Sequence, residues 1–258
     1  MPEETFTPPT SDSASASDAR TRRVWLRALA VVGLVVLGFV GWYYLVELPK
    51  ERRAAAELAK QRAANARTIP DLKLDLVWIA PGEFLMGSPA QHLLVRWFYE
   101  VREKLTKQPN PDSKDRERPM TRVKLTQAFW LGRTEVTRAQ WVAVMGSNPS
   151  GFRGDDLPVE VVTWEDAMAF CQKLTERERA AGRLPAGYAY MLPTEAQWEY
   201  GCRAGTTGDW AGDLDAMAWY DPVNNGSGTL HAVGTKQANV WGLFDMHGNV
   251  WEWCQGCA

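Results

Sequence analysis

The sequence has few of the residues that bind transition metals or act as nucleophiles. Its three histidines, His92, His231 and His247, share no metal-ligand spacing, and His247 is expected to be a hydrogen-bonded turn residue. No glycine-rich nucleotide loop, nucleophile elbow or His-Glu-x-x-His motif occurs, so signatures of nucleotide-binding proteins, α/β-hydrolases and zinc proteases are missing. Neither sign of charge dominates, because 29 basic and 31 acidic residues give a net charge of -2. No nucleic-acid partner is therefore expected.

Cysteine is also scarce. The four cysteines are Cys171, Cys202, Cys254 and Cys257. Only the last two have the spacing of a metal or redox pair, and one such pair supplies half of a zinc site. A chance spacing is the favoured interpretation.

One long uncharged run lies near the N-terminus, from Ala28 to Val46. It is long enough to cross a bilayer, and the aromatic residues at its end suit a membrane interface. We predict a disordered N-terminal tail at residues 1–23, a transmembrane helix at 24–46 and a charged helical stalk at 47–71. A cleaved signal peptide is the alternative, but no small-residue cleavage site follows the run.

This organisation predicts a single-pass membrane protein that contacts lipid through its N-terminal helix. Arginines precede the span and basic residues also follow it, so the positive-inside rule does not decide the orientation. The short leading tail favours a C-terminal domain outside the cytoplasm.

Residues 72–258 are predicted to form one α+β domain. Alternating leucines begin a strand that runs to Ile79, and the turn Ala80-Pro81-Gly82 leads into a second strand, so we expect these two strands to pair. Another strand is expected between Val123 and Leu131. The insertion 89–118 is predicted to contain a helix at 93–105 followed by a loop, and residues 204–240 read as ordered loop.

Three helix starts share one capping pattern. A threonine precedes a glutamine or aspartate by three residues at Thr137, Thr163 and Thr194. The middle helix has a clear apolar face. Its tryptophan and cysteine, Trp164 and Cys171, are expected to be core residues, as is Trp198 in the third helix.

The stretch from Gly242 to Trp253 has an unusual composition of two glycines, two acidic residues, an asparagine and two tryptophans. It fits neither an amphipathic helix nor an alternating strand and predicts a tight, buried turn. Oxygens of Asp245, Asn249 and Glu252 would then enter one small volume. Buried oxygens need hydrogen-bond donors or a metal ion.

Several ordered motifs carry a family resemblance. They are Gly82–Ser88, Glu135–Thr137, Pro158–Trp164, Leu192–Tyr200 and Gly242–Trp253. Over roughly residues 74–253 the sequence resembles the formylglycine-generating enzyme family, also called sulfatase-modifying factor domains. The resemblance implies a C-type-lectin-like fold with little regular secondary structure, here C-terminally incomplete and preceded by the transmembrane helix.

The resemblance also implies a calcium site in the same turn. Asp245 and Glu252 would give side-chain oxygens, and Gly248 and Val250 would give backbone carbonyls, which suits a hard cation. The alternative is that Asp245 caps the turn while Glu252 pairs with a buried arginine. Two carboxylates this close need a counter-charge, which favours the metal.

The family oxidises a sulfatase cysteine to formylglycine, using oxygen and a copper ion held by two cysteines that follow an Arg-Gly-Gly-Ser-Trp motif. The given sequence stops at Ala258 before such a motif, and Cys254 and Cys257 do not correspond to the copper-binding pair. We therefore expect free thiols at Cys171 and Cys202, apolar surface around Trp251 and Trp253, and no copper site or catalytic residue in this chain.

The sequence thus predicts a membrane-anchored formylglycine-generating-enzyme-like protein of an oxidoreductase family, inactive as given. A sulfatase or another polypeptide is the expected partner. The alternative is a non-catalytic, C-type-lectin-like binding or scaffolding module at the cell envelope. A reading frame that continues into the copper-site motif would favour the enzyme.

Overall fold

The computed structural model describes residues 11–88, 119–220 and 229–256, with side chains described from residue 24 onward. The predicted helix at 93–105 and the loop after it lie outside the described residues. The chain divides into two compact units, residues 1–58 and 59–258.

The first unit is helical. It contains α1 (Ser11–Trp42), a π-helical turn η1 (Tyr43–Glu47) and the start of α2 (Leu48–Asn65). Residues 11–23 were predicted to be disordered, which was wrong because α1 begins at Ser11. The helical stretch from Val24 to Asn65 contains a window with mean hydropathy 2.2, long and apolar enough to cross a membrane. A signal sequence has the same properties.

The second unit begins with the last turns of α2. The Arg62 guanidinium lies 4.5 Å from the centre of the Trp241 ring, and Trp130 Nε1 donates to the Asn65 carbonyl at 2.7 Å. The stretch 47–71 is helical only as far as Asn65, because residues 67–69 form the first strand of the domain.

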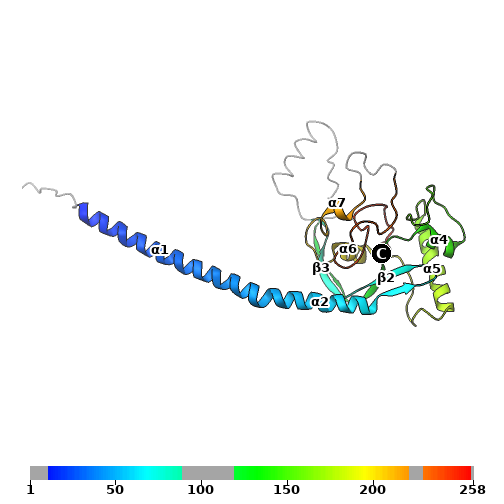
Figure 1. The fold of residues 1–258 in the computed structure, drawn as a ribbon, viewed down its shortest axis with the longest axis horizontal. Coiled ribbons are helices and arrows are strands. Elements are labelled where there is room, and N and C mark those ends of the chain that lie inside the picture. The colour runs from blue at the N-terminus through cyan, green and yellow to red at the C-terminus, as the bar shows by residue number, and fades with distance from the viewer. Residues whose placement is uncertain (1–10, 89–118, 221–228, 257–258) are drawn as a thin grey trace, which may run out of the picture. The chain divides into compact units, whose positions relative to one another are not determined.

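Two separate antiparallel sheets follow (Figure 1). The first has the order β1 (Arg67–Ile69), β2 (Leu74–Ile79), β5 (Phe129–Gly132), and the second pairs β3 (Gly82–Met86) with β4 (Thr121–Leu125). The strand that ends at Ile79 (β2) was expected to pair with the strand after Gly82 (β3). This prediction was wrong, because β2 pairs with β1 along one edge and with β5 along the other. The single strand expected between Val123 and Leu131 is two strands, one in each sheet.

The helices are α4 (Arg138–Met145), α5 (Trp164–Ala180), α6 (Glu195–Arg203) and the short α7 (Leu214–Met217). The three predicted capping boxes are confirmed. Each threonine hydroxyl accepts a hydrogen bond from the backbone three residues later, and that residue's side chain accepts from the threonine N–H.

Two apolar clusters hold the domain together. The first joins leucines of β2 to α4 and α5, where the rings of Trp141 and Phe170 stack with centres 5.1 Å apart. Its seven buried members are Ile69, Leu72, Leu74, Leu76, Trp141, Phe170 and Leu174. The second consists of Ile79, Tyr200, Cys202, Leu243 and Met246, so it anchors the first half of the Gly242–Trp253 turn beside α6.

The predicted core positions are only partly confirmed. Cys171 packs against the first cluster and Trp198 against the second, both half-buried. The Trp164 prediction was wrong, because this first residue of α5 lies at the surface, where its Nε1 donates to the Cys254 carbonyl at 3.0 Å. Trp251 is fully exposed and Trp253 about half exposed, which confirms the apolar surface expected there.

Candidate functional site

The Gly242–Trp253 turn is held by its own polar side chains. Asp245 and Asn249 both adopt left-handed backbone conformations, with φ of 58° and 69°. Asp245 Oδ2 accepts a hydrogen bond from Gly234 N at 2.6 Å. The Asn249 amide exchanges two hydrogen bonds with the backbone of His231, each 3.1 Å long. The two side chains therefore fix the segment 231–234 against the turn.

Gly248 lets a second segment approach the turn. Its neighbour Asn249 donates its N–H to the Trp219 carbonyl at 2.8 Å. A β-carbon on Gly248 would lie 2.2 Å from that carbonyl oxygen, so the close approach requires glycine. The Trp219 ring stacks on His231 with ring centres 3.7 Å apart, which ties all three segments together.

Of the two predicted carboxylate ligands, Asp245 exerts its charge on Glu252. Asp245 is buried, and its Oδ1 has no hydrogen-bond partner. Glu252 Oε2 accepts from Trp198 Nε1 at 3.1 Å. Glu252 is exposed as a whole residue, but burial of its carboxyl group raises the pKa of that group to about 7. The hydrogen bond from Trp198 lowers this pKa, and the negative charge of Asp245 raises it. Gly248 and Val250 are half-buried.

The alternative to a metal ion was that Asp245 caps the turn and that Glu252 pairs with a buried arginine, and only the first part is borne out. Asp245 does cap the turn through Oδ2, as that interpretation expected. The described partner of Glu252 is an indole N–H, however, and not a buried arginine. The counter-charge expected for these carboxylates is therefore not supplied by an ion pair among the described residues.

Sequence reasoning missed a third acid, Glu135, which lies two residues before the Thr137 cap of α4. It is buried, and neither carboxylate oxygen has a hydrogen-bond partner. Burial raises its pKa to about 9, and the negative charges of Asp245 and Glu252 act in the same direction. The signal in the sequence was an acid between Thr134 and Val136 inside a family motif, but only the tertiary fold brings Glu135 to Asp245.

These acids fit a hard cation better than a soft one. Their free atoms are all oxygens, and three of them are buried without a donor. Within the described ranges, no three histidine, cysteine, aspartate or glutamate side chains are grouped so that they could hold a metal by themselves. A calcium ion here would therefore need backbone carbonyls as well, as the sequence prediction for Gly248 and Val250 requires.

The protonation state of the described cysteines does not suit copper binding. Cys171, Cys202 and Cys254 are free thiols, and burial raises their pKa values to about 11, 12 and 11. Such thiols stay protonated at neutral pH, whereas copper and nucleophilic chemistry use the thiolate. Cys202 Sγ lies 3.6 Å from His247 Nδ1.

His247 is a turn residue with a structural hydrogen bond, as predicted. Its Nε2 accepts from Ala211 N at 3.1 Å, which places the ring proton on Nδ1, beside Cys202. Burial lowers the pKa of His247, and the Arg203 charge lowers it further. The Cys202–His247 contact therefore joins a neutral thiol to a neutral ring.

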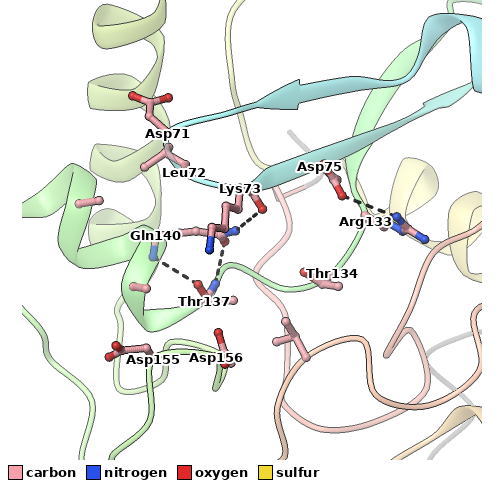
Figure 2. A pocket seen from close by; sticks show the side chains of 13 residues that line it. Asp71, Leu72, Lys73, Asp75, Arg133, Thr134, Thr137, Gln140, Asp155 and Asp156 are labelled. Carbon is pink, nitrogen blue, oxygen red and sulfur yellow. Dashed lines mark hydrogen bonds and ion pairs between the residues drawn. The ribbon is translucent and has the colours of Figure 1, made fainter.

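A polar pocket of about 470 Å³ lies beside the start of α4 (Figure 2). The Thr137–Gln140 capping box forms one wall, and Gln140 Nε2 donates to the Lys73 carbonyl at 3.2 Å. Asp71 and Asp75 in its wall pair with arginines. Glu135 does not line this pocket, so the buried acids and the pocket are separate features.

The comparisons with known proteins support the family resemblance. The sequence profile described as "Sulfatase-modifying factor enzyme 1-like domain" matches residues 60–258. The chain is 32% identical over 171 residues to "Chaperone protein LppX" of Paenibacillus barcinonensis, covering 49% of this chain and 61% of that protein. It is 41% identical over 111 residues to the "Formylglycine-generating enzyme" of Mycobacterium tuberculosis, covering 37% and 32%. The chain thus spans less than two thirds of either relative.

The fold is likewise shared with a solved structure. PvdO from Pseudomonas aeruginosa superimposes with a TM-score of 0.56 at 21% identity, over 75% of this chain and 75% of that one. At this identity the likeness shows the fold alone.

Proposed function

Because the chain belongs to the sulfatase-modifying factor family, we propose that it is a membrane-anchored member whose described domain binds a polypeptide without oxidising it. The observation that carries this proposal is the state of the described cysteines. All three are buried or half-buried free thiols with raised pKa values, whereas copper is held by thiolates.

A polypeptide partner is supported by an aromatic patch, defined as Trp164, Trp251 and Trp253. The Trp164 and Trp253 indoles donate to the carbonyls of Cys254 and Val162, which brings the end of the described chain beside the start of α5. Exposed aromatic surface of this kind marks protein-binding sites. A relative named as a chaperone also fits a role in binding polypeptides.

Oxidation of a sulfatase cysteine is the second candidate. It is favoured by the 41% identity to a formylglycine-generating enzyme over 111 residues.

The C-type-lectin-like character of the fold stays a prediction. On either proposal, the domain lies outside the cytoplasm.

One experiment separates the two candidates. The full chain in detergent micelles, given copper, oxygen and a labelled peptide with a sulfatase-type cysteine motif, should bind the peptide and leave its cysteine unoxidised. Fluorescence anisotropy measures binding and mass spectrometry measures aldehyde formation. The Mycobacterium tuberculosis enzyme serves as the positive control.

The patch itself is tested by Trp251→Ser, which removes a fully exposed ring and should weaken peptide binding about tenfold, the loss of a typical interface anchor. Val240→Ser, at another exposed apolar residue, should leave binding unchanged. Aldehyde above a copper-only control would favour the oxidase instead.

A calcium ion at Asp245, Gly248, Val250 and Glu252 is part of the proposal. It is supported by the buried, unpaired Oδ1 of Asp245 and by the closeness of the Glu252 carboxyl. The ion would bind the three-segment turn in its folded arrangement, and ligands that bind only the folded state stabilise it.

Membrane anchoring is proposed from the apolar helix. After a carbonate wash, the full-length chain should remain in the membrane fraction, because a spanning helix is held by its buried apolar surface and not by charge. Immunoblotting of the pellet and supernatant checks this. Release of a shorter, soluble form would identify the segment as a cleaved signal sequence.

A further inference from the structure

The polar pocket beside the start of α4 is held in shape by main-chain hydrogen bonds between its walls. Its volume of about 470 Å³ is that of a typical small-ligand pocket. Val233 N donates to the Asp156 carbonyl at 3.0 Å. Arg133 N donates to the Asp75 carbonyl at 2.9 Å. A ligand therefore meets walls that are already joined to one another, which lowers the cost of binding.

The start of α4 leaves no backbone donor free for an anion. The N–H groups of Arg138 and Ala139 donate to carbonyls of the loop 155–157, at 2.9 and 3.1 Å. The N–H groups of Thr137 and Gln140 donate within the capping box. The donors that usually attract an anion to the start of a helix are therefore already used.

The charges in the lining favour a cation. The pocket is lined by four aspartates against one lysine and one arginine, a net charge of -2: Asp71, Asp75, Asp155, Asp156, Lys73 and Arg133. Asp71 and Asp75 already pair with arginines. The carboxylates of Asp155 and Asp156 make no ion pair or hydrogen bond with any residue that the structure describes. These two are therefore the groups that remain for a positively charged ligand.

Thr137 adds a buried hydrogen-bond donor to the same pocket. It is 8% exposed and belongs to the lining. Its hydroxyl oxygen accepts from Gln140 N at 3.2 Å, but its hydroxyl hydrogen has no described acceptor. In Figure 2, Asp156 lies on one side of Thr137 and Lys73 on the other. A ligand that satisfies these groups carries a positive charge and, close to it, an oxygen acceptor.

We propose that this pocket binds an α-ammonium group together with the oxygen of the adjoining carboxylate or carbonyl. A free amino acid and the N-terminus of a polypeptide share this chemistry. The ammonium group pairs with Asp155 and Asp156, and the adjoining oxygen accepts from the Thr137 hydroxyl on the side of Lys73. The proposal concerns a different surface from the aromatic patch and does not rest on it.

The ammonium group of a lysine side chain suits the pocket less well. It has no oxygen close by, so the Thr137 hydroxyl would stay unpaired. The two amines also differ in pKa, about 7.7–8.0 for the α-amino group of a peptide and about 10.4 for lysine. Binding of a peptide N-terminus should therefore weaken about tenfold between about pH 7 and pH 9, because the neutral amine forms no ion pair.

Four probes test the proposal by calorimetric titration of the full chain in detergent micelles. Leucine and leucyl-glycyl-glycinamide carry a free α-ammonium group, and their aliphatic side chain suits the apolar part of the lining, Leu72, Ala139, Ala143 and Val233. The N-acetylated peptide lacks the charge, and N-acetyl-lysine amide carries its charge on the side chain alone. At least one of the first two probes should bind, and the last two should not.

The variants Asp155→Asn and Asp156→Asn remove one charge each and keep the shape of the side chain. Because both residues are exposed, each change should weaken binding only about threefold, and the double variant about tenfold. Two acid-to-amide controls outside the pocket should leave binding unchanged. Asp209→Asn alters an exposed aspartate, and Glu83→Gln alters a residue of β3 that pairs with Lys124 at the surface. Circular dichroism shows that each variant is folded.

The outcomes separate the two sources of the ligand. Binding of leucine alone identifies a free amino acid, and binding of the free peptide identifies a polypeptide N-terminus. Equal binding of N-acetyl-lysine amide, or a peptide affinity that is the same at about pH 7 and pH 9, overturns the α-ammonium assignment. The pocket itself is overturned if the folded chain binds no probe, or if the double variant binds like the wild type.

Discussion

Replacing Gly248 by alanine is expected to destabilise the domain by about 2–3 kcal/mol, the cost of forcing an added group into a well-packed site. The new β-carbon would meet the backbone of Trp219, with its carbonyl oxygen at 2.2 Å and its nitrogen at 3.0 Å. Backbone atoms cannot turn away as a flexible side chain can. The bond from Asn249 N to Trp219 and the adjacent ring stack should be lost together.

Thermal melting of the full chain in micelles, followed by near-ultraviolet circular dichroism, measures this effect. The melting temperature should fall by roughly 4–12 °C, given the usual relation for domains of this size. Gly256→Ala is the matched control, because no atom lies within 4 Å of its added β-carbon. A Gly248→Ala variant that melts with the wild type would show that Trp219 does not approach the turn this closely.

The second large effect is a dependence of stability on pH that originates at Glu135. Its pKa is raised from 4.5 to about 9 in the folded domain, so the protonated carboxyl is favoured there. This contribution is complete below the unfolded-state value of 4.5 and declines as the pH rises through the folded value of about 9. With a chelator present, the wild-type melting temperature should therefore fall between pH 5 and pH 9.

Glu135→Gln should remove most of that decline and melt higher than the wild type at pH 9 without calcium. The expected gain is about 1–3 kcal/mol, the penalty of one buried polar group without a partner. Glu252, whose pKa is also raised, leaves a smaller slope in the variant. Glu83→Gln should keep the full wild-type slope, and parallel curves for Glu135→Gln and the wild type would contradict the assignment to Glu135.

Local features of the fold were predictable from the sequence. Thr137, Thr163 and Thr194 cap their helices because capping depends on residues three positions apart. The pairing partners of β2 were not predictable, because the short Ala80-Pro81 link to β3 does not show whether an edge of β2 is free to pair with β3. Both edges of β2 are filled, one of them by β5, which comes some fifty residues later in the chain.

The candidate site was predictable to the same extent. Asp245 and Glu252 belong to one short turn, so their closeness followed from the sequence. Glu135 is distant in sequence and carries no spacing pattern toward Asp245, so only the tertiary fold reveals its electrostatic interaction with Asp245. The Asn249 clamp on His231 was missed for the same reason, although its oxygen was expected in the turn.

The docking of Arg62 on Trp241 and of Asn65 on Trp130 has a practical consequence for soluble fragments of this protein. A fragment that starts at Leu72, the domain boundary predicted from the sequence, would lose the contacts of Arg62 with Trp241 and of Asn65 with Trp130. It would also lose β1 from the first sheet. A fragment that starts at Ala59 keeps all three contacts. The proteolytic boundary of the folded domain should accordingly lie N-terminal to Arg62.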